Sequence, residues 1–277
     1  MSEQGNTEQA SSKFERLNAA KVRFVRHAES MWNARFTDAE AADVVLKSSH
    51  DGAFPLTAKG RDQAHSLKER LGPTDCIIVS SYMRTGQTSE HITVQNDINV
   101  VHRWNEIREF FPFSWEIVRG NFAAERQVPR GEHADFMAPY FERMDIDEKT
   151  PHDPNLPPHM NEQESFKEYF SRVHGFILKL GAFLLENPET KSPVIFSHGF
   201  FIRQLHSQLT KYSDVFKLPD GPERDAQIRE SMRGFEDICM GRSAYDVPNV
   251  AIKEDLDPLL KAYWQKYRKE IENFNLN

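Results

Sequence analysis

The amino-acid sequence predicts an α/β protein with a doubly wound, mostly parallel sheet and helices on both faces of that sheet. Three short apolar segments end on polar residues, at Arg26, Ser80 and Ser197, and helical patterns lie between them. Alternation of strand, crossover helix and strand is typical of this fold class. Open sheets of this kind bind ligands beyond the carboxyl ends of their strands, so we expect a polar site at that edge.

The length of 277 residues suits one large α/β domain or two small ones. The first residues are polar and show no apolar period, so we expect a flexible N-terminal tail over 1–18. A single domain is expected over 19–277. It includes a long insertion over 110–162 and a C-terminal helical extension over 211–277.

The composition excludes several classes of partner. Lys and Arg total 35 against 42 Asp and Glu, which gives a net charge of −7 and disfavours general attraction to nucleic acid or to an anionic membrane. No apolar run approaches the roughly 20 residues that span a bilayer, and no signal-peptide core is found at the start. We therefore expect a cytoplasmic protein. Cys76 and Cys239 are expected to be reduced thiols, and no Cys/His cluster indicates a metal site.

The first predicted strand contains Val22, Phe24 and Val25, an apolar pattern that suits a strand buried in a parallel sheet. A polar loop follows it, with the sequence Arg26-His27-Ala28-Glu29-Ser30-Met31-Trp32-Asn33. Hydrogen-bond donors at the carboxyl end of a strand indicate a phosphate site. A short helix is expected over 38–47. A longer helix is predicted to begin after Thr57 as its N-cap, with apolar residues at helical spacing before Gly72 and Pro73 end it (Ala64, Leu67 and Leu71).

The second predicted strand covers 75–80, a run too short and too rich in β-branched residues for a helix. The chain then turns into a helix that reaches about His91. Arg84 lies in the first turn of this helix. An arginine in such a place is usually solvated, but its position at the end of a second buried strand makes it a candidate for the phosphate site.

The third predicted strand covers 99–102, and two carboxylates follow it, Glu106 and Glu109. The insertion after them is rich in aromatic residues and proline and shows no period. Long loops in compact domains are commonly lids. We expect Phe110 to Pro158 to form a lid with an apolar wall, or else to pack away from the site as a satellite core; the lid offers a second anion contact from Arg119, Arg126 or Arg130.

Beyond the insertion, Glu164 opens an amphipathic helix whose apolar face includes Phe166, Phe170, Val173, Ile177, Leu180 and Leu184. The fourth predicted strand covers 193–197 and is followed by His198 and by a helix over 200–209. Further on we expect a charged helix over 223–233, an edge strand near 247–252 and a last amphipathic helix over 257–274. Such a terminal helix docks on its own domain or, less commonly, makes a dimer contact.

The motifs together resemble the histidine phosphatase superfamily, branch 1, which has the phosphoglycerate mutase-like fold. They occur in the family's order between 21 and 209, at the ends of the predicted strands and at the starts of helices. Two departures stand out: Ala28 replaces the usual glycine, and the Asn-Glu-Ile segment at 105–107 lacks the Phe-Gly that normally follows. The matching segments are Arg-His-Ala-Glu-Ser-x-x-Asn from 26, Pro-Leu-Thr-x-x-Gly-x-x-Gln-Ala from 55, Ser-x-x-x-Arg-x-x-Gln-Thr from 80, Glu-Ser-x(6)-Arg-Val from 164, and Ser-His-Gly from 197.

The resemblance implies a role for each matched residue. His27 would attack phosphorus and form a phosphohistidine, and Glu106 would protonate the leaving group, with Glu109 as the rival if the motif is shifted. The groups that would hold the phosphoryl oxygens are Arg26, Arg84, protonated His198 and Asn33. Neither a metal nor an organic cofactor is required for this chemistry.

The expected function is a phosphomonoester hydrolase that acts on a phosphorylated metabolite or a phosphoprotein, with a homodimer possible through the C-terminal region. Two alternatives stay open. A phosphoglycerate-type mutase is one, although the Arg-x-Tyr-Gly that follows the acid in the family's mutases is replaced by Arg108-Glu109-Phe110. A catalytically weak phosphate-binding or scaffolding protein is the other.

Overall fold

The computed structural model describes residues 14–15, 17–35, 37–47, 51–110, 146–147, 149, 164–239 and 247–276. Most of the predicted insertion over 110–162, including Arg119, Arg126 and Arg130, lies outside the described residues. The lid prediction therefore stays a prediction. Phe110, the first residue of the segment, is buried and stacks on Tyr169 with 4.6 Å between ring centroids.

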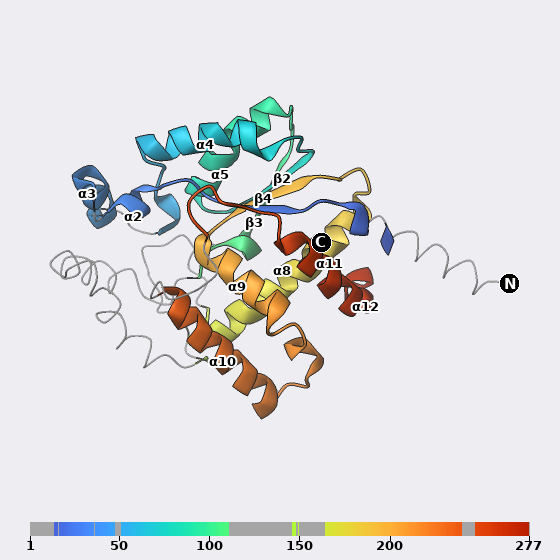
Figure 1. Cartoon of the computed structure of the whole chain (residues 1–277). Helices are drawn as coiled ribbons and strands as arrows, with labels where there is room; N and C mark the ends of the chain where they lie inside the picture. Colours follow the sequence, from blue (N-terminus) through green and yellow to red (C-terminus); the bar gives the residue numbers. More distant parts are fainter. Residues whose placement is uncertain are drawn as a thin grey trace.

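The centre of the fold is a five-stranded sheet with the order β3-β2-β4-β1-β5 (Figure 1). The register pairs Arg26 with Ser197, so these two strands end at the same edge. The predicted mostly parallel sheet is confirmed, because only β5 runs antiparallel among the described strands. The strands are β1 (Arg23–Arg26), β2 (Cys76–Ser80), β3 (Val101–Trp104), β4 (Pro193–Ser197) and β5 (Ile252–Lys253).

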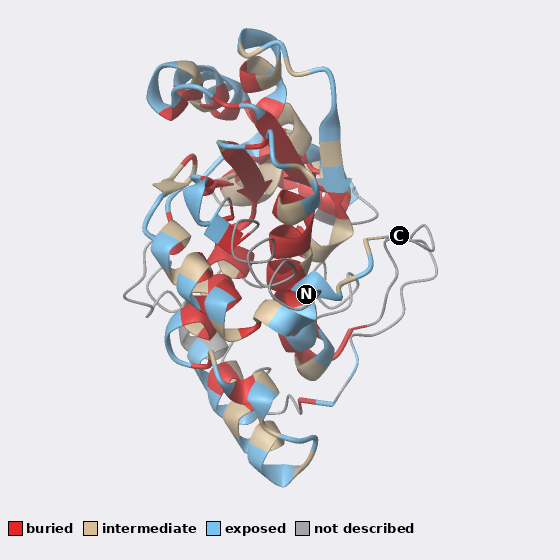
Figure 2. Cartoon of the chain, turned by 90° about the vertical axis from the view of Figure 1, so that its right-hand side faces the viewer, coloured by how far each residue is buried: buried red, intermediate tan, exposed pale blue. Residues whose placement is uncertain are grey.

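Helices cover both faces of the sheet, as predicted (Figure 1). On one face lie α4 (Ala58–Leu71) and α5 (Met83–Gln95), and on the other lie α8 (Phe166–Glu186) and α9 (Gly199–Thr210). Successive strand residues point to opposite faces. Ile77 and Val79 accordingly join the apolar cluster under α4, whereas Cys76 and Ile78 join the larger cluster under α8. Residues of β1, β2 and β4 are almost all buried, and Figure 2 shows buried strands at the centre of the molecule.

The C-terminal extension packs on its own chain. The predicted terminal helix is two helices, α11 (Leu256–Lys266) and α12 (Arg268–Glu272), because Tyr267 between them departs from helical geometry with φ −113° and ψ 32°. Trp264 is fully buried and donates from Nε1 to the carbonyl oxygen of Ile177, 2.9 Å away. A β-carbon at Gly181 would lie 3.0 Å from that same Nε1, so α8 accommodates the indole through a glycine.

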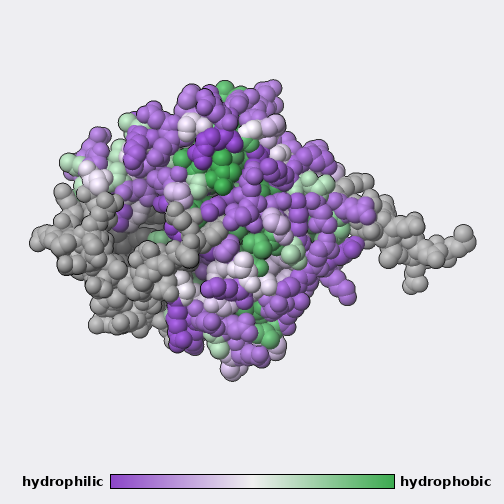
Figure 3. Space-filling model, viewed as in Figure 1, coloured by the Kyte–Doolittle hydropathy of each residue, from purple (hydrophilic) through white to green (hydrophobic). Residues whose placement is uncertain are grey.

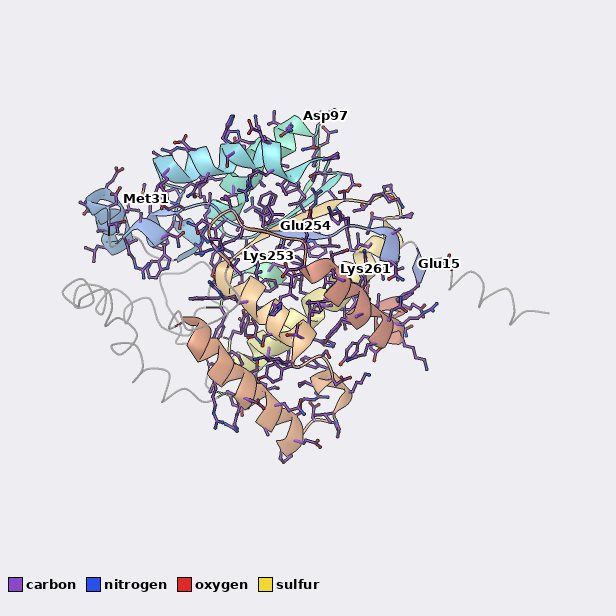
Figure 4. All side chains as sticks on the ribbon, in the orientation of Figure 1. Glu15, Met31, Asp97, Lys253, Glu254 and Lys261 are labelled. Atoms are coloured by element: carbon purple, nitrogen blue, oxygen red, sulfur yellow. The ribbon has the colours of Figure 1, made fainter. Side chains whose placement is uncertain are left out.

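The predicted tail over 1–18 is too long by several residues. Phe14 and Leu17 are 3% and 1% exposed and belong to the core under α8. The guanidinium carbon of Arg268 lies 4.4 Å from the centre of the Phe14 ring, so this segment packs beside the C-terminal helices. In Figure 4, Glu15 and Lys261 lie on this same side of the molecule. Apolar burial fixes these residues, although their sequence neighbours are polar.

The remaining described elements are short or lie at the periphery: α2 (Met31–Ala34), α3 (Ala39–Lys47), η1 (Asp51–Ala53), η2 (Asn105–Ile107), η4 (Val215–Lys217) and α10 (Pro222–Cys239). Among the described residues, no helix combines the length and apolarity needed to cross a bilayer. The face shown in Figure 3 is mainly hydrophilic where it is described, with smaller hydrophobic areas between.

Candidate active site at the carboxyl edge of the sheet

His27 follows β1 directly and is 3% exposed. Its Nδ1 lies 2.7 Å from the carbonyl oxygen of Ala28, and its Nε2 accepts a hydrogen bond from Nε of Arg84 at 3.2 Å. A carbonyl only accepts and a guanidinium only donates. Both contacts therefore require the same tautomer, with the proton on Nδ1 and the lone pair on Nε2.

The rings of the two candidate histidines lie together. Their centroids are 5.2 Å apart, and His198 is fully buried. Nε2 of His198 lies 2.9 Å from Oγ of Ser80, at the end of β2. Among the described residues its Nδ1 has no hydrogen-bond partner. Three neighbouring strands thus meet at this site: β1 contributes His27, β4 contributes His198 and β2 contributes Ser80.

Two arginines supply positive charge at this edge. Arg84 is 2% exposed, and its guanidinium carbon lies 4.8 Å from the centre of the Tyr82 ring. Arg26 donates from Nη1 to the carbonyl oxygen of Val247, 2.7 Å away, in the segment that leads to β5. A β-carbon at Gly199 would lie 3.1 Å from Nε of Arg26 and 3.2 Å from Nη1 of Arg203. The absent side chain of Gly199 therefore leaves room for guanidinium groups beside His198.

The loop after β1 is held by the start of α4. The carbonyl oxygen of Glu29 accepts from N of Thr57 at 3.0 Å, and N of Glu29 donates to Oε1 of Gln63 at 2.8 Å. A β-carbon at Gly60 would lie 1.9 Å from the same carbonyl oxygen. The Thr-x-x-Gly-x-x-Gln motif at 57–63 is thus a support for the backbone beside His27. Thr57 caps α4 as predicted, since its side chain accepts from N of Gly60.

A second support comes from α5. Thr88 accepts at Oγ1 from N of Ala28, 3.0 Å away, and donates to the carbonyl oxygen of Arg84 at 2.6 Å. This hydroxyl links the loop that carries His27 to the turn that carries Arg84. Ala28 is fully buried in the cluster under α4, so its methyl group fills core space and does not enter the site.

Asn33 lies on α2, and its Oδ1 accepts from both N and Oγ of Ser30, at 3.1 and 3.0 Å. These contacts fix the orientation of the amide, because Oδ1 must face Ser30. The Nδ2 group is therefore the end of Asn33 that can donate to an anion.

The sequence left open whether Glu106 or Glu109 is the proton donor, and the structure gives these two carboxylates different partners. The Glu106 carboxylate is paired with Nζ of Lys179 on α8 at 2.7 Å, and its side chain is 34% exposed. Glu109 accepts instead from the backbone of α9, from N of Phe201 at 2.9 Å and N of Phe200 at 3.3 Å. Glu106 thus faces α8, whereas Glu109 contacts the helix that begins beside His198.

The backbone around Glu106 is fixed by Arg172 of α8. Arg172 donates from Nη1 to the carbonyl oxygens of Glu106 and Arg108, at 2.6 and 3.1 Å. Its Nε and Nη2 bind the two carboxylate oxygens of Glu164, at 2.6 and 2.8 Å. This bidentate pair explains the spacing in the Glu-Ser-x(6)-Arg-Val segment, for which the sequence alone indicated no role.

Burial and neighbouring positive charge lower the pKa of both histidines. Burial, together with the charges of Arg84 and Arg26, holds the pKa of His27 well below its usual value. Burial and the charge of Arg84 do the same to the pKa of His198, with smaller effects from His27, Arg26 and Arg172. Two arginines and a dry environment disfavour a further positive charge here. The protonated form of His198 therefore stays a prediction, and it depends on the negative charge of a bound phosphoryl group.

The structure brings Arg26, His27, Arg84 and His198 together. It also reveals contributors that the sequence analysis missed as site residues, namely Ser80, Tyr82, Thr88 and Arg203. The rings of Tyr82 and His198 lie 5.0 Å apart. For Ser80 and Tyr82 the available signal was their place at the end of β2, next to Arg84. Within the described part of the chain, no group of three or more His, Cys, Asp or Glu side chains is placed to hold a metal ion.

Comparison with solved structures gives low overall similarity. An alpha-ribazole phosphatase from Shigella flexneri shows 20% identity and a TM-score of 0.44, over 76% of this chain and 83% of the other. A mycobacterial glucosyl-3-phosphoglycerate phosphatase shows 18% identity and a TM-score of 0.46, over 83% of this chain and 88% of the other. A phosphoserine phosphatase from Entamoeba histolytica shows 16% identity and a TM-score of 0.42, over 83% of this chain and 87% of the other. Similarity at this level assigns neither an activity nor a substrate to the chain.

Comparison with curated proteins found no match. The sequence model of the histidine phosphatase superfamily (branch 1) matches residues 22–217, a stretch that runs from the start of β1 to η4 and includes every candidate site residue named above. The chain therefore belongs to the histidine phosphatase superfamily, branch 1.

Proposed function

We propose that this protein is a phosphomonoester hydrolase that works through a phosphohistidine on His27. The observation that carries the proposal is the tautomer of His27. The contacts with Ala28 and Arg84 together require the lone pair on Nε2, and the lowered pKa of His27 favours the neutral ring. A neutral, oriented imidazole next to two arginines is suited to attack an anionic phosphoryl group.

The first step forms a bond between Nε2 of His27 and phosphorus and breaks the bond to the leaving oxygen. Arg26, Arg84 and the amide of Asn33 donate to the equatorial oxygens, whose negative charge they stabilise. His198 joins them through a ring nitrogen. A bound phosphate dianion favours the protonated form of His198, because an opposite charge nearby stabilises the imidazolium.

Glu106 is proposed as the acid that protonates the leaving oxygen. As a carboxylate it then takes a proton from the water that hydrolyses the phosphohistidine, which releases phosphate and restores His27. This role requires the Glu106 side chain to leave Lys179, with which it forms an ion pair. The side chains of Lys179 and Glu106 are 22% and 34% exposed, and this partial exposure permits such a rotation.

The substrate proposed is a phosphorylated metabolite or a phosphoprotein, since the described site contains groups for the phosphoryl end alone. A phosphate-binding protein with little turnover is the second candidate. The ion pair between Glu106 and Lys179 favours it, because that pair withdraws the proposed acid from the site.

Hydrolysis of 4-nitrophenyl phosphate by the purified protein separates the two candidates. We expect turnover that is lost in His27→Ala, and we expect rapid quench without acid, followed by mass spectrometry, to find phosphate on His27. Phosphate on His198, or full activity in His27→Ala, contradicts the mechanism. Binding of inorganic phosphate without any turnover supports the second candidate.

A further inference from the structure

The helix that begins beside His198 is capped from another part of the chain. The first N–H groups of a helix have no partner within it. His198 is the N-cap of α9 but makes no side-chain hydrogen bond to it. The carboxylate of Glu109 supplies the missing acceptors, because its Oε1 accepts from N of Phe201 at 2.9 Å and its Oε2 accepts from N of Phe200 at 3.3 Å.

The segment that carries Glu109 is itself held firmly. The carbonyl oxygen of Ile107 accepts from Oγ of Ser197 at 2.8 Å, and Ile107 is fully buried. On the other side of Glu109, Phe110 is 2% exposed and stacks on Tyr169 of α8 with 9° between the ring planes. Glu109 is thus anchored on both sides, and its carboxylate bridges to the start of α9.

This bridge fixes the backbone from which the second histidine projects. The ring of His198 must reach Ser80 at 2.9 Å and lie 5.2 Å from the ring of His27. A carboxylate accepts two N–H bonds best when it is ionised, and the N-terminus of a helix favours a negative charge. Such a group is suited to holding a helix in place, whereas an acid must present a proton to the leaving oxygen.

We propose that Glu109 is a positioning residue for His198, which it holds in register with His27 by capping α9. The inference rests on the proposed function. It also explains a departure from the family's pattern, since this carboxylate stands where the motif has phenylalanine. Glu109 is then the structural partner of the second histidine, and Glu106 remains the proposed acid.

Three variants test the role: Glu109→Ala removes the cap, Glu109→Gln keeps an oxygen acceptor, and Asp75→Ala is the matched control. Asp75 accepts from two backbone N–H groups as well, at N of Lys191 (2.6 Å) and N of Ser192 (2.9 Å), but it lies next to the amino ends of β2 and β4. The substrates are 4-nitrophenyl phosphate and phenyl phosphate, which differ in how much their leaving groups need a proton. The imidazole resonances of His27 and His198 are recorded in ¹⁵N NMR spectra.

We expect Glu109→Ala to lower kcat/KM by about 10- to 100-fold, equally for both substrates, because misplacement of a site group acts on each turnover alike. Glu109→Gln should recover most of this loss, and Asp75→Ala should stay within about twofold of the parent protein. In Glu109→Ala the His198 resonances should shift while those of His27 stay in place.

Several results overturn the proposal. A loss in Glu109→Gln that is larger with phenyl phosphate makes Glu109 the proton donor. Equal losses in Glu109→Ala and Asp75→Ala make the effect one of general stability. Unchanged His198 resonances in Glu109→Ala refute the positioning role, and this readout does not require activity. If the parent protein hydrolyses neither substrate, that result contradicts the proposed function and leaves the NMR test of positioning in place.

Discussion

Nε of Arg84 donates to Nε2 of His27 across 3.2 Å, so a guanidinium binds the lone pair that the proposed reaction uses. The backbone of Arg84 is fixed, because its carbonyl oxygen accepts a hydrogen bond from Oγ1 of Thr88. A phosphoryl group must therefore replace His27 as the acceptor for Arg84. Its oxygens attract the guanidinium more strongly than a neutral imidazole does, since charge-assisted hydrogen bonds are the stronger kind. In the proposed mechanism, substrate binding would thus free the lone pair of His27 for attack on phosphorus.

Glu106→Gln should lower kcat/KM for phenyl phosphate by about 10²- to 10⁴-fold, the usual contribution of general acid catalysis. The loss should shrink for 4-nitrophenyl phosphate, because nitrophenolate leaves without a proton. Steady-state rates for a series of aryl phosphates measure this dependence. A loss of equal size across the series would show that Glu106 does not act as the acid.

Gly60→Ala should destabilise the protein, because the new β-carbon would lie 1.9 Å from the Glu29 carbonyl oxygen, a backbone atom that cannot move aside alone. We expect a loss of about 1–3 kcal/mol or more in the free energy of unfolding, measured by urea denaturation. The control is Gly175→Ala in the middle of α8, where nothing lies within 4 Å of the built β-carbon. That change should leave the free energy of unfolding unchanged or raise it by about 0.5–1 kcal/mol. The same loss in both variants would contradict the steric argument.

Gly199→Ala should reduce phosphate binding with little effect on folding. Its β-carbon would meet the ends of two flexible side chains, Nε of Arg26 at 3.1 Å and Nη1 of Arg203 at 3.2 Å. These groups can shift, so urea denaturation should show a change within about 1 kcal/mol. A displaced guanidinium weakens a charged hydrogen bond, and inorganic phosphate should therefore inhibit about tenfold less well. Unchanged inhibition by phosphate would show that Arg26 does not contact the anion.

The stability of the protein should fall as the pH drops from about 6.5 to about 4, partly because of His174. Burial, with a smaller effect from the charge of Arg224, lowers the pKa of His174 from 6.5 to about 4. Between these values the unfolded chain binds the proton and the folded chain does not, so acid favours unfolding. The contribution is at most about 3–4 kcal/mol. His174→Gln should flatten the dependence of the unfolding free energy on pH in this window, and an unchanged slope would contradict the assignment.

Much of the fold follows from local pattern. The apolar runs that end at Arg26, Ser80 and Ser197 form three parallel strands. Thr57 and Gly72 lie at the two ends of α4, as expected. These features depend on neighbours within a few residues, such as a cap, a period or a helix-breaking glycine, and such neighbours are visible in a sequence. The third strand was less well placed, since β3 begins at Val101 and not at Asn99. Among its residues only Trp104 is buried, so the strand carries a weaker apolar signal.

The sequence by itself determined which residues reach the carboxyl edge of the sheet, because parallel strands with short turns bring their ends together whatever packs around them. Only the tertiary structure decided how those residues face. The ion pair with Lys179 directs Glu106 toward α8, and the carboxylate of Glu109 binds the first N–H groups of α9. Arg26 donates to the carbonyl oxygen of Val247, which lies beyond the residues that match the family. These partners lie tens to hundreds of residues away in the chain. A side chain's direction depends on contacts that exist only after the helices have packed, so no local pattern encodes it.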